Sequence, residues 1–175
     1  MRSELPRLTL VLGGAASGKS AFAEGVVSKT GRPRIYIATA MAFDEEMSKK
    51  IAEHRESRGP DWRTIEAPRD LTAAFAEVEA SDVVLLDCAT LWLSNVMLAD
   101  EEPELAFEDL FDALENCAAP VVVVSNETGM GIVPEHKLGR AFRNAQGRLN
   151  QRLAARADCV VMVAAGLPMF LKGSA

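Results

Sequence analysis

A run of eight residues near the N-terminus constrains the fold of this chain more than any other feature. The run reads Gly13-Gly14-Ala15-Ala16-Ser17-Gly18-Lys19-Ser20 and follows the apolar segment 8–12, so it matches a strand followed by the pattern G-x-x-x-x-G-K-[ST]. Glycines let successive backbone N–H groups curl around an anion, and the helix that follows adds its positive N-terminal end. The run therefore predicts a phosphate-binding loop between a strand and a helix, in a chain that binds a nucleoside triphosphate.

Two side chains of this loop have chemistry suited to a triphosphate. Lys19 is expected to reach the β- and γ-phosphates, and Ser20 is expected to place its hydroxyl on Mg²⁺ from the first helical turn. The alternative is a glycine-rich turn that binds nothing. The apolar strand before the loop and the helix-forming segment 21–24 after it favour the nucleotide site.

Short apolar runs alternate with helical patterns along the rest of the chain. The predicted strands cover 7–12, 34–38, 83–87, 120–124 and 159–163, and the predicted helices cover 18–29, 44–57, 70–79, 104–116 and 138–156. The runs 83–86 and 121–124 are continuously apolar, which is typical of parallel strands covered on both faces. The pattern predicts an α/β, three-layer, P-loop NTPase-like fold with a mainly parallel central sheet, in a single nucleotide-binding catalytic domain over residues 1–175.

Composition and charge argue against several classes of protein. The net charge of −6 argues against a nucleic-acid partner held through phosphate contacts. The three cysteines, Cys88, Cys117 and Cys159, are odd in number and lack C-x-x-C spacing, so neither a disulfide framework nor a zinc site is indicated. No stretch of 18 apolar residues and no secretion signal is recognised, which favours a cytoplasmic protein without a membrane span and with inert, mostly buried thiols.

Polar residues follow several predicted strands, at the sheet edge where α/β proteins bind ligands. Asp87 ends an apolar strand, which would place one carboxylate beside Mg²⁺, although a turn or helix-capping role is the alternative. The segment Ala38-Thr39-Ala40 follows another strand. Glu127, after the valine run, is a candidate for a role near the metal or as a base, against the alternative of a solvated loop carboxylate.

The segment 44–59 is predicted to form a helix with acidic residues in its first turn and basic residues in its last. His54 lies near its C-terminal end, where spacing alone does not separate a nucleophile from a solvated helix position. Arg55 and Arg58 are three residues apart and could clamp phosphate or form a solvated charged face.

Several ordered segments together resemble the bifunctional adenosylcobinamide kinase/adenosylcobinamide-phosphate guanylyltransferase family. The resemblance covers almost the whole chain and is far more specific than the phosphate loop alone. The segments that carry it are the phosphate loop, Tyr36-Ile37-Ala38-Thr39-Ala40, residues 51–58, Trp62-Arg63-Thr64-Ile65-Glu66, Leu85-Leu86-Asp87-Cys88, residues 126–134, residues 140–143 and 147–151, and Gly166-Leu167-Pro168.

The resemblance implies two reactions on one substrate. The hydroxyl of adenosylcobinamide is phosphorylated with ATP or GTP, and GMP is then transferred from GTP to adenosylcobinamide phosphate through a guanylylated histidine, which falls on His54. The resemblance also implies a small homo-oligomer, a trimer in particular. The nucleotide contacts that it implies fall on Gly13 through Ser20, Ala38, Thr39, Ala40, Arg55, Glu56, Ser57, Arg58, Glu66 and Asp87.

The chain departs from the family pattern at one position, and the roles of several other residues stay unassigned. Ala16 stands where members of the family usually carry arginine, which bears on nucleotide affinity and on the kinase step. Glu66 is a candidate to accept hydrogen bonds from guanine. The surface that takes the corrin ring is unassigned; the candidates Trp92, Met97 and Met130 have core packing as their alternative.

Three other classes compete with this interpretation. A monofunctional P-loop kinase of another small metabolite would explain the loop and Asp87, but would leave His54 without a task. A regulatory GTPase should carry Asn-Lys-x-Asp after a late strand, where this chain has Ser125-Asn126-Glu127-Thr128. A nucleotide-binding scaffold without catalysis is disfavoured because Lys19, Ser20, Asp87 and His54 are all present.

Overall fold

The structure, a computed structural model, describes residues 5–41 and 45–174, with the side chains at positions 46, 47, 50, 53, 54, 55 and 57 left out. Strands and helices alternate along the chain, as the sequence predicts. Their bounds are β1 Leu8–Gly13, α1 Lys19–Ser28, β2 Arg34–Ala38, α2 Glu45–Arg58, β3 Trp62–Glu66, α3 Leu71–Ala76, β4 Val83–Asp87, α4 Ala89–Leu98, α5 Pro103–Asn116, β5 Val121–Asn126, α6 Lys137–Arg156, β6 Cys159–Ala164 and β7 Leu167–Lys172.

The strands form a seven-stranded sheet in the order β3-β2-β4-β5-β1-β6-β7. Every neighbouring pair is parallel except β6 and β7, which form an antiparallel hairpin at one edge. Parallel neighbours are joined by helical crossovers, so the carboxyl ends of six strands meet at one edge of the sheet. The predicted fold, a mainly parallel sheet between helical layers, is confirmed.

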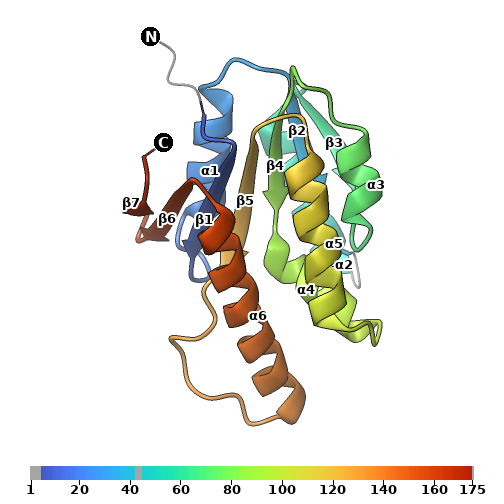
Figure 1. Cartoon of the computed structure of the whole chain (residues 1–175), viewed down its shortest axis with the longest axis vertical. Coiled ribbons are helices and arrows are strands. Elements are labelled where there is room, and N and C mark those ends of the chain that lie inside the picture. The colour runs from blue at the N-terminus through green and yellow to red at the C-terminus, as the bar shows by residue number, and fades with distance from the viewer. Residues whose placement is uncertain (1–4, 42–44, 175) are drawn as a thin grey trace.

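Helices cover both faces of the sheet, and the core lies in two layers between them (Figure 1). Helix α1 covers one face, where its Ala23 and Val27 meet alternate residues of the strands. Helices α3, α4, α5 and α6 cover the other face and bury Phe107, Leu110 and Leu149 against the remaining strand residues. Both faces of the central strands are therefore buried, which explains their uninterrupted valine and leucine runs.

Three elements were not among the predicted strands and helices. Strand β3 lies at one edge of the sheet and mixes polar with apolar residues. Only Cys88 separates the end of β4 from the start of α4, so the sequence offers little to divide the strand from the apolar helix. Strand β7 is exposed along its whole length although its sequence is mostly apolar.

The segment between β5 and α6 extends beyond the carboxyl edge of the sheet, together with the N-terminal half of α6 (Figure 1). This segment, residues 127–136, is called here the β5–α6 loop. It places a surface beyond the strand ends, on the side where the predicted site residues collect. Among the described residues, no helix is both long enough and apolar enough to span a membrane.

Candidate functional site

The predicted phosphate loop lies between β1 and α1, as the sequence pattern requires. Strand β1 ends at Gly13 and α1 begins at Lys19. Gly18 caps the helix with a φ of 90°, a left-handed conformation that a side chain would strain, which explains the glycine. Ala16 adopts a φ of 54° in the same turn without being glycine. The loop therefore curls back on itself, and the N–H of Ser17 bonds the Gly14 carbonyl at 3.3 Å.

Backbone from distant parts of the chain fixes the phosphate loop in place. The N–H of Gly166, in the turn between β6 and β7, donates to the Ser17 carbonyl at 2.8 Å. A methyl group on Gly18 would lie 3.1 Å from the Gly166 Cα, so the two backbones nearly touch. On the other side, the N–H of Glu127 donates to the Gly13 carbonyl at 3.0 Å. The loop is held between the C-terminal hairpin and the start of the β5–α6 loop.

The two side chains predicted to act on a triphosphate begin helix α1. The ammonium group of Lys19 donates to the Gly14 carbonyl at 3.0 Å, and so folds back over the loop. Ser20 follows it in the first turn and is only partly buried. An amine over curled backbone, at the positive end of a helix, forms a group of hydrogen-bond donors suited to phosphate oxygens.

Asp87 ends β4 beside this loop, with one strand between β4 and β1. Its carboxylate accepts a hydrogen bond from the Tyr36 hydroxyl, and burial together with this negative charge raises the pKa of Tyr36 above its usual range. Burial, followed by the charge of Asp87, raises the pKa of Cys88 to about 11, while the positive charge of Lys19 opposes that rise. Lys19 and Asp87 thus act on the same thiol, which places the phosphate loop and this carboxylate in one site.

The segment Ala38-Thr39-Ala40 links the ends of two strands. The Thr39 side chain is fully buried; its hydroxyl donates to the Cys88 carbonyl at 2.8 Å and accepts from the Cys88 N–H at 2.9 Å. The Asn95 amide donates to the Thr39 carbonyl at 2.8 Å. The hydroxyl of Thr39 is therefore used inside the protein, where it ties β2 to the residue that follows Asp87.

Helix α2 carries the predicted histidine and arginines, and the Arg58 side chain connects the C-terminal end of this helix to the sheet. The Arg58 guanidinium carbon lies 3.4 Å from the centre of the Tyr36 ring, the residue that bonds Asp87. Glu56 is exposed. The side chains of His54, Arg55 and Ser57 lie outside the part of the structure that is described. The structure therefore ties the end of α2 to the Asp87 side of the site.

Glu66 lies at the end of β3, opposite Ala38 in the sheet register, and is exposed. It also borders a cavity of about 590 Å³ between β3, α3, α4 and α5. Three strands, β2, β4 and β5, lie between β3 and β1 in the sheet. A nucleotide with its phosphates at Lys19 would have to extend along the carboxyl edge of the sheet to bring its base to Glu66.

A buried polar cluster beside the phosphate loop was not anticipated from the sequence. The Ser125 hydroxyl donates to the Asn150 Oδ1 at 2.7 Å, and the Gln146 amide donates to the same oxygen at 2.9 Å. The Asn150 amide donates to the Asn126 carbonyl at 2.9 Å, and the Thr90 hydroxyl accepts from the Asn126 N–H at 2.7 Å. This cluster fixes the backbone that leads into Glu127. The i,i+4 spacing of Gln146 and Asn150 in an otherwise apolar helix face is the signal that could have revealed it.

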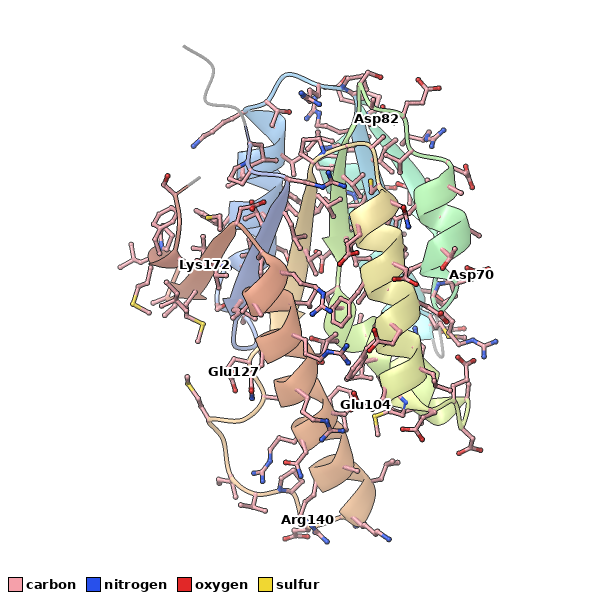
Figure 2. The ribbon with its side chains drawn as sticks, viewed as in Figure 1. Asp70, Asp82, Glu104, Glu127, Arg140 and Lys172 are labelled. Atoms are coloured by element: carbon pink, nitrogen blue, oxygen red, sulfur yellow. The ribbon has the colours of Figure 1, made fainter. Side chains whose placement is uncertain are left out.

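Glu127 itself uses its carboxylate locally, since it accepts a hydrogen bond from the Gly129 N–H. Figure 2 shows the Glu127 side chain at the end of the sheet, on the side where the phosphate loop lies.

Of the three candidates for the corrin surface, Trp92 is a core residue, 2% exposed, whose indole N–H donates to the Arg69 carbonyl at 2.9 Å. Met130 is 81% exposed on the β5–α6 loop, and Met97 lines a second cavity on the same side.

Two solved structures share the fold of this chain, at sequence identities that show the fold alone. An ATPase from the type III secretion system of pathogenic bacteria aligns with a TM-score of 0.57 and 13% identity, over 95% of this chain and 57% of that one. The flagellar accessory protein FlaH from Methanocaldococcus jannaschii aligns with a TM-score of 0.53 and 13% identity, over 97% and 80%.

Comparison of sequences is far more specific. A family model described as cobinamide kinase / cobinamide phosphate guanyltransferase matches residues 9–171. The bifunctional adenosylcobalamin biosynthesis protein CobP of Pseudomonas aeruginosa is 46% identical over 94% of this chain and 96% of its own length. The corresponding protein CobU of Salmonella typhimurium is 41% identical over 94% of this chain and 99% of its own length. With the phosphate loop, the partly buried Asp87 and nearly the full length matched, this chain belongs to the cobinamide kinase / cobinamide phosphate guanyltransferase family.

Proposed function

We propose that this protein phosphorylates the hydroxyl of adenosylcobinamide with ATP or GTP and then transfers GMP from GTP to the resulting phosphate. The products are adenosylcobinamide-GDP and pyrophosphate. Membership of the family supports this activity, and a phosphate loop held between Gly166 and Glu127 beside Asp87 is the observation that carries it.

The site has the donors that a magnesium nucleotide requires. The Ser20 hydroxyl and the Asp87 carboxylate supply oxygen, the ligand type that Mg²⁺ prefers, and Mg²⁺ normally keeps several waters and phosphate oxygens around so few protein groups. Among the described residues, no group of three or more His, Cys, Asp or Glu side chains could hold a metal without a nucleotide. Mg²⁺, when bound with the nucleotide, would neutralise the charge that develops on the phosphates.

In the kinase step, the residues of the loop position the phosphates and stabilise charge. The substrate hydroxyl oxygen attacks the γ-phosphorus, the bond to the β,γ-bridging oxygen breaks, and the hydroxyl proton leaves to a base or to water. Lys19 would turn from the Gly14 carbonyl to the phosphates, where its charge stabilises the oxygens of the transition state. Tyr36 would hold the Asp87 carboxylate in place through its hydrogen bond.

In the transfer step, His54 would act as the nucleophile. A neutral imidazole nitrogen attacks the α-phosphorus of GTP, and the bond to the α,β-bridging oxygen breaks to release pyrophosphate. A phosphate oxygen of adenosylcobinamide phosphate then attacks the same phosphorus, and the P–N bond breaks to return free His54. Arg55 or Arg58 would neutralise charge on the α-phosphate and on the departing pyrophosphate.

We also infer that the protein works in the cytoplasm as a homo-oligomer, a trimer in particular. Strand β7 supports this inference because it pairs only with β6 in the described sheet and exposes apolar side chains along both faces. Phe170 and Leu171 are 50% and 62% exposed. Natural proteins rarely leave a long apolar edge strand uncovered. Light scattering of Phe170→Glu should show a smaller particle than the wild type.

The experiment that tests the function separates its two halves. The purified protein is incubated with Mg²⁺ and GTP labelled at either the α- or the γ-phosphate, and the protein is examined for an acid-labile, alkali-stable adduct. We expect α-label on the wild type and on His136→Ala, the matched control at the second histidine of the sequence, and none on His54→Ala. An absence of α-label in spite of nucleotide binding would leave a monofunctional kinase.

A further inference from the structure

An apolar cavity of about 430 Å³ lies between the end of α4 and the start of α6, away from the phosphate loop. Met97 and Leu98 contribute from α4, and Leu138 and Phe142 contribute from α6. The remaining lining residues are Ser94, Pro134, His136 and Gly139. Leu98 and Leu138 are 61% and 59% exposed, so the cavity opens to solvent through leucine side chains. A surface of this composition favours an apolar ligand.

The cavity is held open by defined contacts of the β5–α6 loop. A methyl group on Gly139 would lie 2.9 Å from the Pro134 Cβ, so the loop packs against α6 at a distance that only glycine permits. The Arg140 guanidinium donates to the Pro134 carbonyl at 3.0 Å and also to the Glu135 carbonyl. These contacts fix the wall that Pro134 and His136 form.

The β5–α6 loop connects this cavity directly to the nucleotide site. Its first residue, Glu127, bonds the phosphate loop through the Gly13 carbonyl, and its last residues form the cavity wall. Figure 2 shows Glu127 at the end of the sheet and Arg140 at the far end of α6. The same loop exposes Met130 and Ile132, at 81% and 97%. The loop that runs from the phosphate loop to the cavity therefore exposes apolar side chains along its course.

We propose that this cavity and the exposed apolar residues of the β5–α6 loop seat the corrin ring of the cobinamide substrate. The proposal rests on the proposed function. A corrin is a broad ring with methyl groups on its rim, and its reacting hydroxyl lies at the end of a flexible arm. The ring therefore needs an apolar surface outside the phosphate site, from which the arm can reach the γ-phosphate. His136 gives this surface one polar edge, suited to a side-chain carboxamide of the ring.

The larger cavity of about 590 Å³ is less suitable for the ring. Acidic side chains surround it, and the Arg69–Glu101 ion pair, at 2.6 Å, lies on its lining. Burying an apolar ring there would remove water from these charges without replacing its hydrogen bonds. The acidic members of the lining are Glu66, Asp70, Glu77, Glu101 and Asp109.

The test uses Leu138→Glu, which places a charge at the cavity mouth, and Leu105→Glu as the matched control. Leu105 is a 68% exposed leucine of α5 that lines neither cavity. Equilibrium dialysis with dicyanocobinamide, followed by its visible absorbance, measures binding to each intact protein. Labelling with α-labelled GTP in the absence of corrinoid checks the nucleotide site, and light scattering gives the mass. We expect Leu138→Glu to weaken cobinamide binding at least tenfold while it still takes the α-label, and Leu105→Glu to match the wild type.

Two other results would overturn the proposal, and a third separates it from the proposed function. Unchanged cobinamide binding by Leu138→Glu, or an equal loss in Leu105→Glu, would show that the ring sits elsewhere. A smaller particle for Leu138→Glu alone would assign this face to contact between copies of the chain. A wild type that binds cobinamide but takes no label contradicts only the proposed transfer step, and the dialysis of the two variants still decides where the ring binds.

Discussion

Gly13 and Gly14 are adjacent glycines of the phosphate loop that should respond oppositely to the same substitution. In Gly13→Ala, the new methyl carbon would lie 2.7 Å from the Val163 carbonyl oxygen and 2.3 Å from the Ser17 hydroxyl. Val163 is the sheet partner of Gly13, so its carbonyl cannot move away without opening the pairing of β1 and β6. In Gly14→Ala, the methyl carbon would meet nothing within 4 Å.

The size of the difference follows from these contacts. Forcing a methyl group into a filled space lowers the free energy of unfolding by about 1–3 kcal/mol. In a protein of this size, each kcal/mol shifts the Tm by about 2–4 °C, so Gly13→Ala should lower the Tm by about 2–12 °C. Gly14→Ala should leave the Tm unchanged or raise it slightly, because alanine restricts the unfolded chain.

Calorimetry with and without Mg²⁺ and GTP measures both effects. A ligand at 100 times its Kd adds about 2.7 kcal/mol of stability, which for the wild type corresponds to a rise of about 5–11 °C. Gly14→Ala should lose most of this rise, because its methyl group would occupy the open side of the loop where the phosphates are expected. If both variants lose the same stability without nucleotide, the packing argument for Gly13 is wrong.

Three further predictions concern the sheet edge and the core. Glu66→Gln should raise the KM for GTP more than the KM for ATP, and equal changes would remove the guanine role. The raised pKa of Cys88 means that the folded state holds the thiol proton more tightly than the unfolded state does. The stability that this thiol contributes is therefore full below about pH 9 and is lost as the pH rises through about 11. Cys88→Ala should flatten the fall in Tm over that pH range. Asn150→Ala removes the hydrogen bonds of Asn150 to Ser125, Gln146 and the Asn126 backbone. It should lower the free energy of unfolding, measured in urea, by about 2–4 kcal/mol. A loss under about 1 kcal/mol would contradict the role of the polar cluster.

The central strands and most helices could be predicted from the sequence because their burial is uniform. Strands β1, β4 and β5 are covered on both faces, so their runs are apolar apart from Thr9 and the polar residues that end β4 and β5. Strand β3 has a neighbour on one side only, and its mixed residues give no such run. Strand β7 gives the opposite difficulty, because its residues are mostly apolar but exposed, and in the described sheet it pairs with β6 alone.

Part of the candidate site could likewise be predicted from the sequence, and part could not. Lys19, Ser20 and Asp87 lie in patterns whose geometry is local, a loop between strand and helix and the last residue of a strand, and the structure brings Lys19 and Asp87 into one site. The attachment of Arg58 to the Tyr36 ring depends on how α2 packs against β2, which spacing along the chain does not encode. The role of Thr39 as a buried link between strands was hidden for the same reason.

The turn between β6 and β7 makes the C-terminal hairpin part of the nucleotide site. A chain that ended at residue 164 would keep every residue of the phosphate loop motif, but the Ser17 carbonyl would lose the N–H of Gly166. Gly18 would also lose the backbone against which it packs. A truncation designed around the phosphate loop motif would therefore remove a support of that loop together with an edge strand that looks dispensable. If the shortened protein failed to bind GTP, the failure would say nothing about the motif itself.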